Sequence, residues 1–372
     1  MRIGVPTEIK CNEFRVGLVP GSVRELTARG HEVVVQSGAG AGTFATDADY
    51  EKAGASILPT ADAVFAAADM IVKVKEPQAV EVARLRSNQI LFTYLHLAPD
   101  PEQARGLLAS GATAIAYETV TDANGGLPLL APMSEVAGRL AIEAAAIALR
   151  RPTGGRGVLM GGVPGVRPAK VVVLGGGVVG THAARMAAGL GADVSIIDRS
   201  LPRLRQLDEL FEGRVRTLAS TMDTIETEVL GADVVVGAVL VAGASAPKLV
   251  TRDMLPRMKR GAVLVDVSID QGGCFETSRS TTHAEPTFEV DGVIHYCVAN
   301  MPGAVPGTSA QALNNATLPF VTRLADKGLA ALDEDKHLAA GLNVRDGRIT
   351  HEAVAASLGF DRLSSTKVLR AA

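Results

Sequence analysis

The feature that most constrains the fold of this chain is a series of short, uninterrupted apolar runs rich in Val and Ile. They lie at residues 3–5, 32–36, 70–74, 90–94, 113–117, 170–174, 193–197, 233–238, 262–267 and 293–298. Runs that are apolar at successive positions, rather than at every second one, are typical of strands covered by helices on both faces. Helical patterns at 22–29, 182–191, 201–211 and 221–230 lie between runs. This alternation predicts a doubly wound α/β architecture with parallel sheets.

The chain length predicts more than one domain. At roughly 150 residues per domain, 372 residues suggest two or three domains. A helical pattern at 134–150, with Ser134 as its expected N-cap, and another at 311–327 are placed to join them. We therefore expect a discontinuous first domain, 1–130 plus 310–372, around an inserted domain at 131–309.

Charge and cysteine content exclude several classes of protein. The 37 basic and 40 acidic residues give a net charge of −3, so no basic surface predicts nucleic acid or an anionic membrane as a partner. The three cysteines, Cys11, Cys274 and Cys297, are scattered along the chain and odd in number, which argues against a disulfide framework and for a reducing compartment.

The sequence also argues against membrane targeting. Charges within the first ten residues argue against a signal peptide. The longest stretch without Asp, Glu, Lys or Arg, 292–322, is too rich in Pro and Asn to span a bilayer. No Cys or His cluster has metal-ligand spacing, so we expect a soluble, cytoplasmic protein without a metal.

The most informative motif is the segment VVVLGGGVVGTHAARMAAGLGADVSIID, residues 171–198. Gly175, Gly177 and Gly180 follow a predicted strand with the spacing G-x-G-x-x-G and precede a helix. Gly175 permits a tight turn, Gly177 allows backbone to approach a pyrophosphate, and Gly180 allows close helix–strand packing. The amides of Val178 and Val179 at the helix N-terminus would then bind the pyrophosphate. The segment predicts a dinucleotide-binding Rossmann domain.

Asp198, which ends the next predicted strand, indicates the nucleotide. It follows Gly180 by eighteen residues, near the spacing at which a carboxylate binds the adenosine ribose hydroxyls. A carboxylate there repels a 2′-phosphate and favours NAD, although the adjacent Arg199 leaves use of NADP open. A second glycine cluster, Gly38, Gly40 and Gly42, lacks a correctly spaced third glycine and a following helix, so we interpret it as a structural loop.

Four polar residues near predicted strand ends are candidates for chemistry, because ligands of α/β proteins bind at the carboxyl ends of parallel strands. Lys75 and His96 close two runs, Asp270 follows a third, and Arg15 lies in a loop. Alone, each is more often a solvated, ion-paired or buried structural residue. Together with a dinucleotide they suit oxidation of an amino or hydroxy acid: arginine for a carboxylate, lysine for a carbonyl oxygen and histidine for proton transfer.

Segments throughout the chain resemble the alanine dehydrogenase family. They are MRIGVPTEIKCNEFRVGLVP, KVKEP, YLHLAPD, LAPMSEVAGRLA, GGRGVLMGGVPGV, VDVSIDQGGCFETSRSTTH, PTFEVDGVIHYCVANMPGAVP and ALNNAT. The resemblance implies two Rossmann-like domains and reversible oxidative deamination of L-alanine by NAD, giving pyruvate, ammonium and NADH. It also implies a cytoplasmic homohexamer, whereas the residues alone indicate only an oligomer.

The resemblance also assigns residues. It implies that Arg15 and Lys75 bind substrate and that His96 and Asp270 transfer protons. The implied cofactor-binding residues are Ser134, Gly175, Gly177, Val178, Val179, Gly180, Asp198, Arg203, Ser220, Val239, Leu240, Val267, Ser268, Ile269, Asp270, Arg279, Val298, Ala299, Asn300 and Met301. Gly307 departs from the family, whose members often have a basic residue there.

Three other functions remain open on the sequence. The first is a nucleotide-binding subunit like the NAD(H)-binding component of transhydrogenases, which would have no use for Arg15, Lys75 and His96 together. The second is a non-catalytic NAD sensor, which would tolerate loss of the same residues. The third is a related carboxyalkyl-amino-acid dehydrogenase, which would act on larger substrates.

Overall fold

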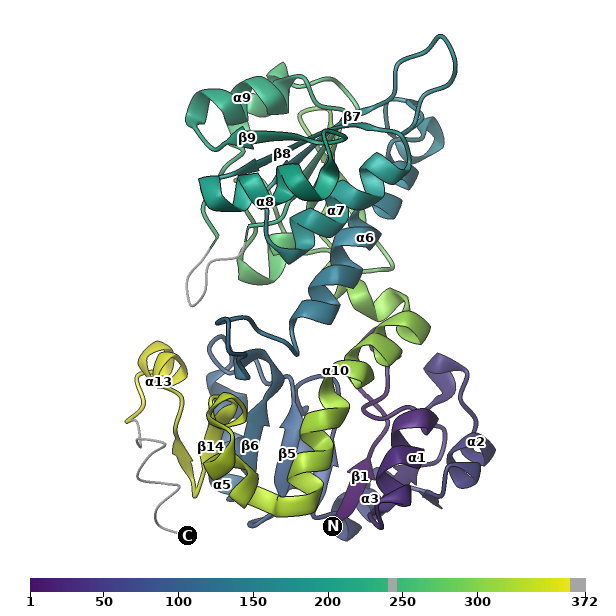
Figure 1. The fold of residues 1–372 in the computed structure, drawn as a ribbon, viewed down its shortest axis with the longest axis vertical. Coiled ribbons are helices and arrows are strands. Elements are labelled where there is room, and N and C mark those ends of the chain that lie inside the picture. The colour runs from purple at the N-terminus through teal and green to yellow at the C-terminus, as the bar shows by residue number, and fades with distance from the viewer. Residues whose placement is uncertain (240–245, 362–372) are drawn as a thin grey trace. The chain divides into compact units, whose positions relative to one another are not determined.

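The structure, a computed structural model, describes residues 1–239 and 246–361 and divides the chain into two compact units (Figure 1). The first unit comprises Met1–Met133 and Gly303–Ala372, and the second comprises Ser134–Pro302. Among the described residues, no helix has both the length and the apolar character that crossing a bilayer requires.

The first unit is built on an eight-stranded sheet. In spatial order its strands are β15 (Arg348–Ile349), β14 (Leu342–Arg345), β6 (Thr113–Ala116), β5 (Ile90–Thr93), β4 (Met70–Val72), β1 (Arg2–Val5), β2 (Glu32–Gln36) and β3 (Ser56–Leu58). The six strands from β6 to β3 are parallel, and β14 and β15 extend the sheet in antiparallel fashion.

Helices cover both faces of this sheet. Val34 of β2, Ile71 of β4 and Leu91 of β5 belong to one core cluster that also contains residues of α3, α5 and α13. Their strand neighbours, such as Val33, are also buried, because successive side chains in a strand point to opposite faces. The helices of the unit are α1 (Pro20–Ala28), α2 (Asp47–Lys52), α3 (Ala61–Ala67), α4 (Ala79–Val82), α5 (Pro101–Ser110), α10 (Pro306–Lys327), α11 (Ala331–Glu334), α12 (Lys336–Ala339) and α13 (Glu352–Leu358).

The second unit is built on a seven-stranded sheet. In spatial order its strands are β12 (Thr287–Val290), β13 (Val293–Tyr296), β11 (Val263–Asp266), β10 (Val234–Gly237), β7 (Lys170–Leu174), β8 (Asp193–Asp198) and β9 (Arg216–Ala219). Its helices include α7 (Val178–Gly189), α8 (Leu201–Phe211) and α9 (Met222–Leu230). Val171 and Val173 lie in one core cluster, whereas Val172 and Leu174 lie in another on the opposite face. Burial of both faces explains why this strand is apolar at successive positions.

The two sheets share one strand order. From β9 to β13 the second sheet runs β9-β8-β7-β10-β11-β13, and the first runs β3-β2-β1-β4-β5-β6. Both correspond to the Rossmann order, in which the order of the chain reverses beside the first strand. The predicted doubly wound, two-part α/β architecture is therefore confirmed. The reversal point lies between β7 and β10 in one unit and between β1 and β4 in the other, and ligands of such sheets bind at the carboxyl ends of these strands.

One local prediction is wrong. Ser134 was expected to cap a helix, but α6 (Ala131–Ala148) begins three residues earlier and contains Ser134 in its first turn. Pro132 explains the earlier start, because proline suits the first turn of a helix, where its missing N–H is not needed. The helix expected from residue 311 likewise begins earlier, at Pro306, another proline in a first turn.

Candidate active site and nucleotide site

The glycine loop of the second unit forms the junction between β7 and α7. Gly175 has φ +104°, and a Cβ on it would lie 2.5 Å from the carbonyl oxygen of Ala238 at the end of β10. A Cβ on Gly180 would lie 1.8 Å from the carbonyl oxygen of Gly175, so only glycine permits this approach of helix and loop. A Cβ on Gly177, in contrast, would meet no atom within 4 Å. The loop is therefore tightly packed at Gly175 and Gly180, whereas there is free space beside Gly177.

The N-terminus of α7 has the donors that an anion needs. Gly177 is the N-cap residue and supplies no side chain, so no side-chain cap competes for the first-turn amides, which include those of Val178 and Val179. Val178 is exposed. First-turn amides and the helix dipole together favour a negatively charged group. The residues therefore fit the pyrophosphate of a dinucleotide.

Asp198 and Arg203 are hydrogen-bonded to this loop. One carboxylate oxygen of Asp198 accepts the amide of Gly176 at 2.7 Å, and the other accepts the amide of Ser200 at 2.8 Å. Arg203 Nε donates to the carbonyl oxygen of Gly176 at 2.7 Å, and its Nη2 donates to the Thr181 hydroxyl at 2.8 Å. The predicted acid thus lies beside the glycine loop, and Arg203 links the loop to α8.

Other predicted cofactor residues follow the carboxyl ends of further strands in the same sheet as β7 and β8. Ser220 follows β9, and its amide donates to the carbonyl oxygen of Asp198 at 3.0 Å. Ser268, in the 3₁₀ helix η5 (Val267–Gln271), donates its hydroxyl to the carbonyl oxygen of Val239 at 2.8 Å. The residues after β11 are Val267, Ser268, Ile269 and Asp270, and those after β13 include Val298, Ala299, Asn300 and Met301. Leu240 lies outside the described residues.

Ser134 and Arg279 are not at strand ends. Ser134 lies one turn before Gly138 on the same face of α6, and a Cβ on Gly138 would lie 2.3 Å from the Val179 carbonyl oxygen. This places Ser134 on the face of α6 that packs against the start of α7. Arg279 is exposed, with its guanidinium 4.2 Å from the ring centroid of Phe288.

A buried aspartate that the sequence analysis did not select holds the Asp270 segment in place. Asp266, at the end of β11, accepts the amides of Ser268, Cys274 and Phe275 at 3.1, 2.9 and 3.2 Å and also the Ser278 hydroxyl. Burial raises the pKa of Asp266, although these hydrogen bonds oppose the shift. The carboxylate closes the loop that carries Asp270, which is itself exposed.

In the first unit, Lys75 follows β4, and its backbone is tied to both neighbouring strands. Its amide donates to Glu8 Oε2 at 3.3 Å, and its carbonyl oxygen accepts the Thr93 hydroxyl of β5 at 2.9 Å. Glu8 follows β1 and also accepts the amide of Val74 at 2.6 Å. Glu8 therefore bridges β1 and β4 at the reversal point of this sheet.

Lys73, buried behind this bridge, holds Glu8. Its Nζ lies 3.1 Å from Glu8 Oε2 and 2.7 Å from Glu81 Oε1. Burial alone lowers the pKa of Lys73, but the two carboxylates outweigh it and raise the pKa above its usual value. The sequence analysis selected Lys75 and missed Lys73 and Glu8, because a buried ion pair between distant segments leaves no local motif.

Arg15 is buried and paired with Glu13. Arg15 Nε donates to Glu13 Oε1 at 2.7 Å, Nη2 pairs with the other carboxylate oxygen, and Nη1 contacts the sulfur of Met133. Burial lowers the pKa of Arg15, yet the hydrogen bonds and charge of Glu13 outweigh it and raise the pKa. Arg15 remains a full cation that is held rigidly.

His96 is stacked on Tyr94, and Arg15 lies within electrostatic reach of the same ring. The rings of Tyr94 and His96 are stacked with centroids 5.7 Å apart, and the charge of Arg15 acts on the Tyr94 phenol. The Tyr94 hydroxyl donates to the carbonyl oxygen of Leu129 at 2.5 Å, which fixes the ring. Lys75 and His96 follow the adjacent strands β4 and β5, and Arg15 acts on Tyr94, so all three residues lie toward the carboxyl edge of the first sheet.

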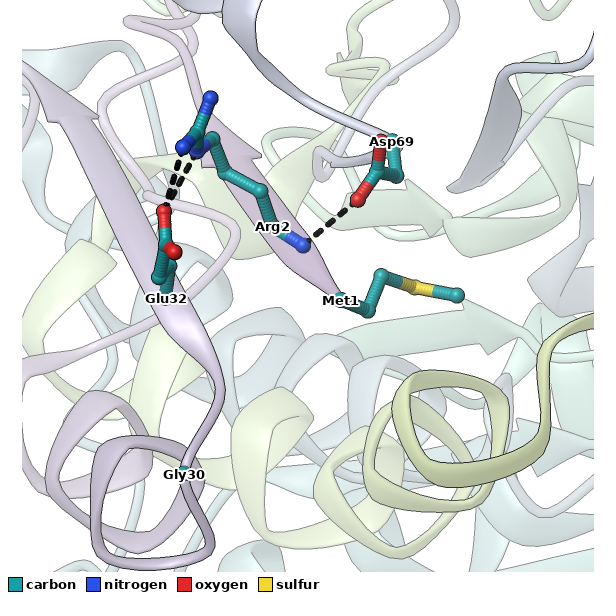
Figure 2. Close-up of a pocket in the computed structure, with 5 residues that line it drawn as sticks. All are labelled: Met1, Arg2, Gly30, Glu32 and Asp69. Atoms are coloured by element: carbon teal, nitrogen blue, oxygen red, sulfur yellow. Dashed lines mark hydrogen bonds and ion pairs between the residues drawn. The ribbon is translucent and has the colours of Figure 1, made fainter.

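A polar hollow at the opposite edge of that sheet is not part of this arrangement. Arg2, Glu32 and Asp69 line it together with Met1 and Gly30 (Figure 2). Arg2 pairs with Glu32, and its amide donates to Asp69 at 2.8 Å. These residues lie at the amino ends of β1, β2 and β4, where α/β sheets do not normally place ligands.

The fold and the glycine loop define a dinucleotide-binding α/β protein with a second Rossmann-like unit. Two family models match the chain: the N-terminal domain of alanine dehydrogenase/PNT over residues 4–137 and the C-terminal domain over residues 141–352. The chain belongs to this family, as its sequence resemblance predicted.

Relatives match over their full length. The alanine dehydrogenase of Halomonas elongata is 60% identical over 370 residues, covering 99% of this chain and 100% of the relative. The alanine dehydrogenase of Mycobacterium tuberculosis H37Rv is 56% identical over 370 residues, with the same coverage. Among solved structures, an L-alanine dehydrogenase matches with a TM-score of 0.94 and 54% identity, covering 96% of this chain and 99% of its own. A transhydrogenase from Sinorhizobium meliloti matches with a TM-score of 0.82 and 28% identity, covering 94% of this chain and 100% of its own.

Proposed function

We propose that this chain is an NAD-dependent L-alanine dehydrogenase. The reaction converts L-alanine, NAD⁺ and water to pyruvate, ammonium, NADH and a proton, and it is reversible. The observation that supports the proposal most strongly is the identity of 60% with an alanine dehydrogenase over 99% of this chain. The gathering of Arg15, Lys75 and His96 at one sheet edge gives that identity a chemical basis.

Each of the proposed substrate-site residues has its own role. Arg15 binds the carboxylate of pyruvate or alanine, since a guanidinium recognises carboxylates through paired hydrogen bonds. Lys75 donates to the ketone oxygen and stabilises the negative charge that develops there. His96 and Asp270 are the proposed proton-transfer residues. A bound nicotinamide nucleotide supplies or accepts the hydride.

The nucleotide residues favour NAD. The Asp198 carboxylate accepts two loop amides and keeps further lone pairs for the ribose hydroxyls. A 2′-phosphate on the ribose would lie against this carboxylate and be repelled. Arg199 is exposed, whereas Asp198 is half-buried beside the loop, so the acid dominates the preference.

The test is spectrophotometric. Purified protein with NAD and L-alanine should produce NADH at about pH 9–10, where removal of the released proton favours deamination. NADP should support a much lower rate.

His96→Ala should lower turnover by about 10²–10⁴-fold while leaving NADH affinity nearly unchanged. Tight NADH binding without alanine-dependent absorbance would contradict the proposal, and an equal loss of turnover and NADH affinity in His96→Ala would make His96 structural.

The second candidate is a transhydrogenase-like nucleotide-binding subunit, favoured by the structural match to the transhydrogenase of Sinorhizobium meliloti. Such a subunit would exchange hydride with a second nucleotide and not with alanine. The identity of 28% to that structure, against 54% to an L-alanine dehydrogenase, favours the dehydrogenase. Hydride exchange between NADH and an NADP analogue, without any response to pyruvate and ammonium, would reverse this preference.

We further propose that the protein acts in the cytoplasm as a homo-oligomer, a hexamer by analogy with its family. Its partners are then small molecules and copies of itself. Light scattering of the purified protein measures the oligomer directly, and a monomer would contradict this part of the proposal.

A further inference from the structure

The carboxylate of Glu118 holds the backbone of His96. Glu118 lies in the 3₁₀ helix η2 (Tyr117–Thr119), directly after β6, and β6 pairs with β5, the strand that precedes His96. Glu118 Oε1 accepts the His96 amide at 2.6 Å, and both of its carboxylate oxygens lie 3.2 Å from the Leu95 nitrogen. One side chain thus binds two consecutive amides of the neighbouring strand end.

The held segment has an unfavourable backbone conformation. His96 has φ +47°, in the left-handed region that residues other than glycine rarely adopt. Such a conformation persists only when the surroundings impose it, and it is common at active sites. Hydrogen bonds from amides to an ionised carboxylate are stronger than those to a neutral acceptor, which suits Glu118 to this purpose. Gln103 of α5 adds a further bond, from its amide group to the Leu95 carbonyl oxygen at 3.0 Å.

The imidazole has Tyr94 and Glu118 as neighbours. The Tyr94 ring is stacked on it with an interplanar angle of 8°. His96 Nδ1 lies 4.0 Å from Glu118 Oε1, the same oxygen that accepts the His96 amide. The Glu118 side chain is only 16% exposed, so water weakens these interactions little.

We propose that Glu118 is a positioning residue for His96 in proton transfer to or from the substrate. Its carboxylate binds the amides of the left-handed backbone turn from which the imidazole projects, at the sheet edge where we propose that the substrate binds. This inference rests on the proposed dehydrogenase function for its catalytic consequence, but the structural role of Glu118 does not depend on that function.

The catalytic test is a double-mutant cycle in the full-length protein. Glu118→Gln keeps the size of the side chain and removes its charge, and it should lower kcat by about 10–10²-fold with little change in the KM for pyruvate, because small displacements of a reacting group have effects of this size. In the His96→Ala background the same substitution should lower the residual rate less than twofold. Glu102→Gln, on an exposed carboxylate paired with Arg105, is the control and should change neither parameter.

The structural test is amide hydrogen exchange. In Glu118→Gln, exchange at residues 95 and 96 should accelerate at least tenfold, whereas the control should leave it unchanged. Faster exchange with unaltered kcat would overturn the catalytic role, and unaltered exchange would overturn the positioning role. An equal loss of rate in both His96 backgrounds would also overturn the proposal. If the unsubstituted protein lacks alanine-dependent activity, the proposed function fails, and the exchange measurement still tests whether Glu118 holds this segment.

Discussion

At the scale of single residues, Lys75 and His96 of the first unit are each held through the backbone by a carboxylate that the proposed reaction does not use. Glu8 binds the Lys75 amide, and Glu118 binds the His96 amide. The sequence analysis found Lys75 and His96 because both follow apolar runs. It missed the two carboxylates because each acts on backbone from a different strand end, and backbone hydrogen bonds across a sheet leave no spacing to recognise.

Removing the cation of the buried ion group should be costly. Lys73→Met would leave Glu8 and Glu81 buried side by side without their partner, and breaking a buried pair in this way costs about 3–5 kcal/mol. We expect that decrease in the free energy of unfolding, measured by urea denaturation. Lys52→Met, on the exposed end of α2, should change it by less than about 0.5 kcal/mol. Equal effects of the two substitutions would mean that the buried lysine contributes no more than a surface one.

At the scale of elements, the continuous apolar runs correctly predicted ten strands, from β1 to β13, because these are buried on both faces. The strands that the analysis missed lie at or near sheet edges. β9 and β12 have mixed, partly exposed patterns, and β15 has two residues, so they lack the signal that a central strand carries. Edge strands are specified by the neighbour they pair with more than by their own composition.

The glycine loop allows a matched pair of substitutions. Gly180→Ala would place a methyl group against the Gly175 carbonyl oxygen, and such overpacking should destabilise the second unit by about 1–3 kcal/mol or more. Gly177→Ala meets open space and should leave stability within about 0.5 kcal/mol, while weakening NADH binding because its methyl group points where the pyrophosphate would lie. Thermal unfolding and NADH titration of both variants check this. A Gly177→Ala protein with full NADH affinity would argue against the proposed pyrophosphate position.

At the scale of the whole molecule, stability should depend on pH through a buried histidine. His295 Nδ1 donates to the Val293 carbonyl oxygen at 3.1 Å, and Nε2 accepts the Thr277 hydroxyl at 2.7 Å. Burial lowers the pKa of His295 below 6.5, although the bond to Val293 opposes the shift. Below about pH 6.5 the unfolded chain therefore binds a proton that the folded chain resists, and stability falls as the pH falls.

The measurement is the unfolding midpoint, followed by circular dichroism from pH 8 to pH 5.5. The midpoint of the unsubstituted protein should decrease below about pH 6.5. His295→Asn, which keeps a donor for the Val293 carbonyl oxygen, should show a shallower decrease. Some slope should remain, because burial also lowers the pKa of His182. Parallel curves for the two proteins would show that His295 does not contribute.

The shared strand order of the two sheets has a consequence for how this enzyme family can change. Each sheet has its own core and its own point of reversal, so the loops proposed to bind the organic substrate and the loops proposed to bind the nucleotide follow separate sets of strands. Reshaping the turns after β1, β4 and β5 alters one set without touching the residues that follow β7, β8 and β10. We therefore expect that engineering the first unit can give new substrate preferences while the nucleotide site proposed in the second unit is retained.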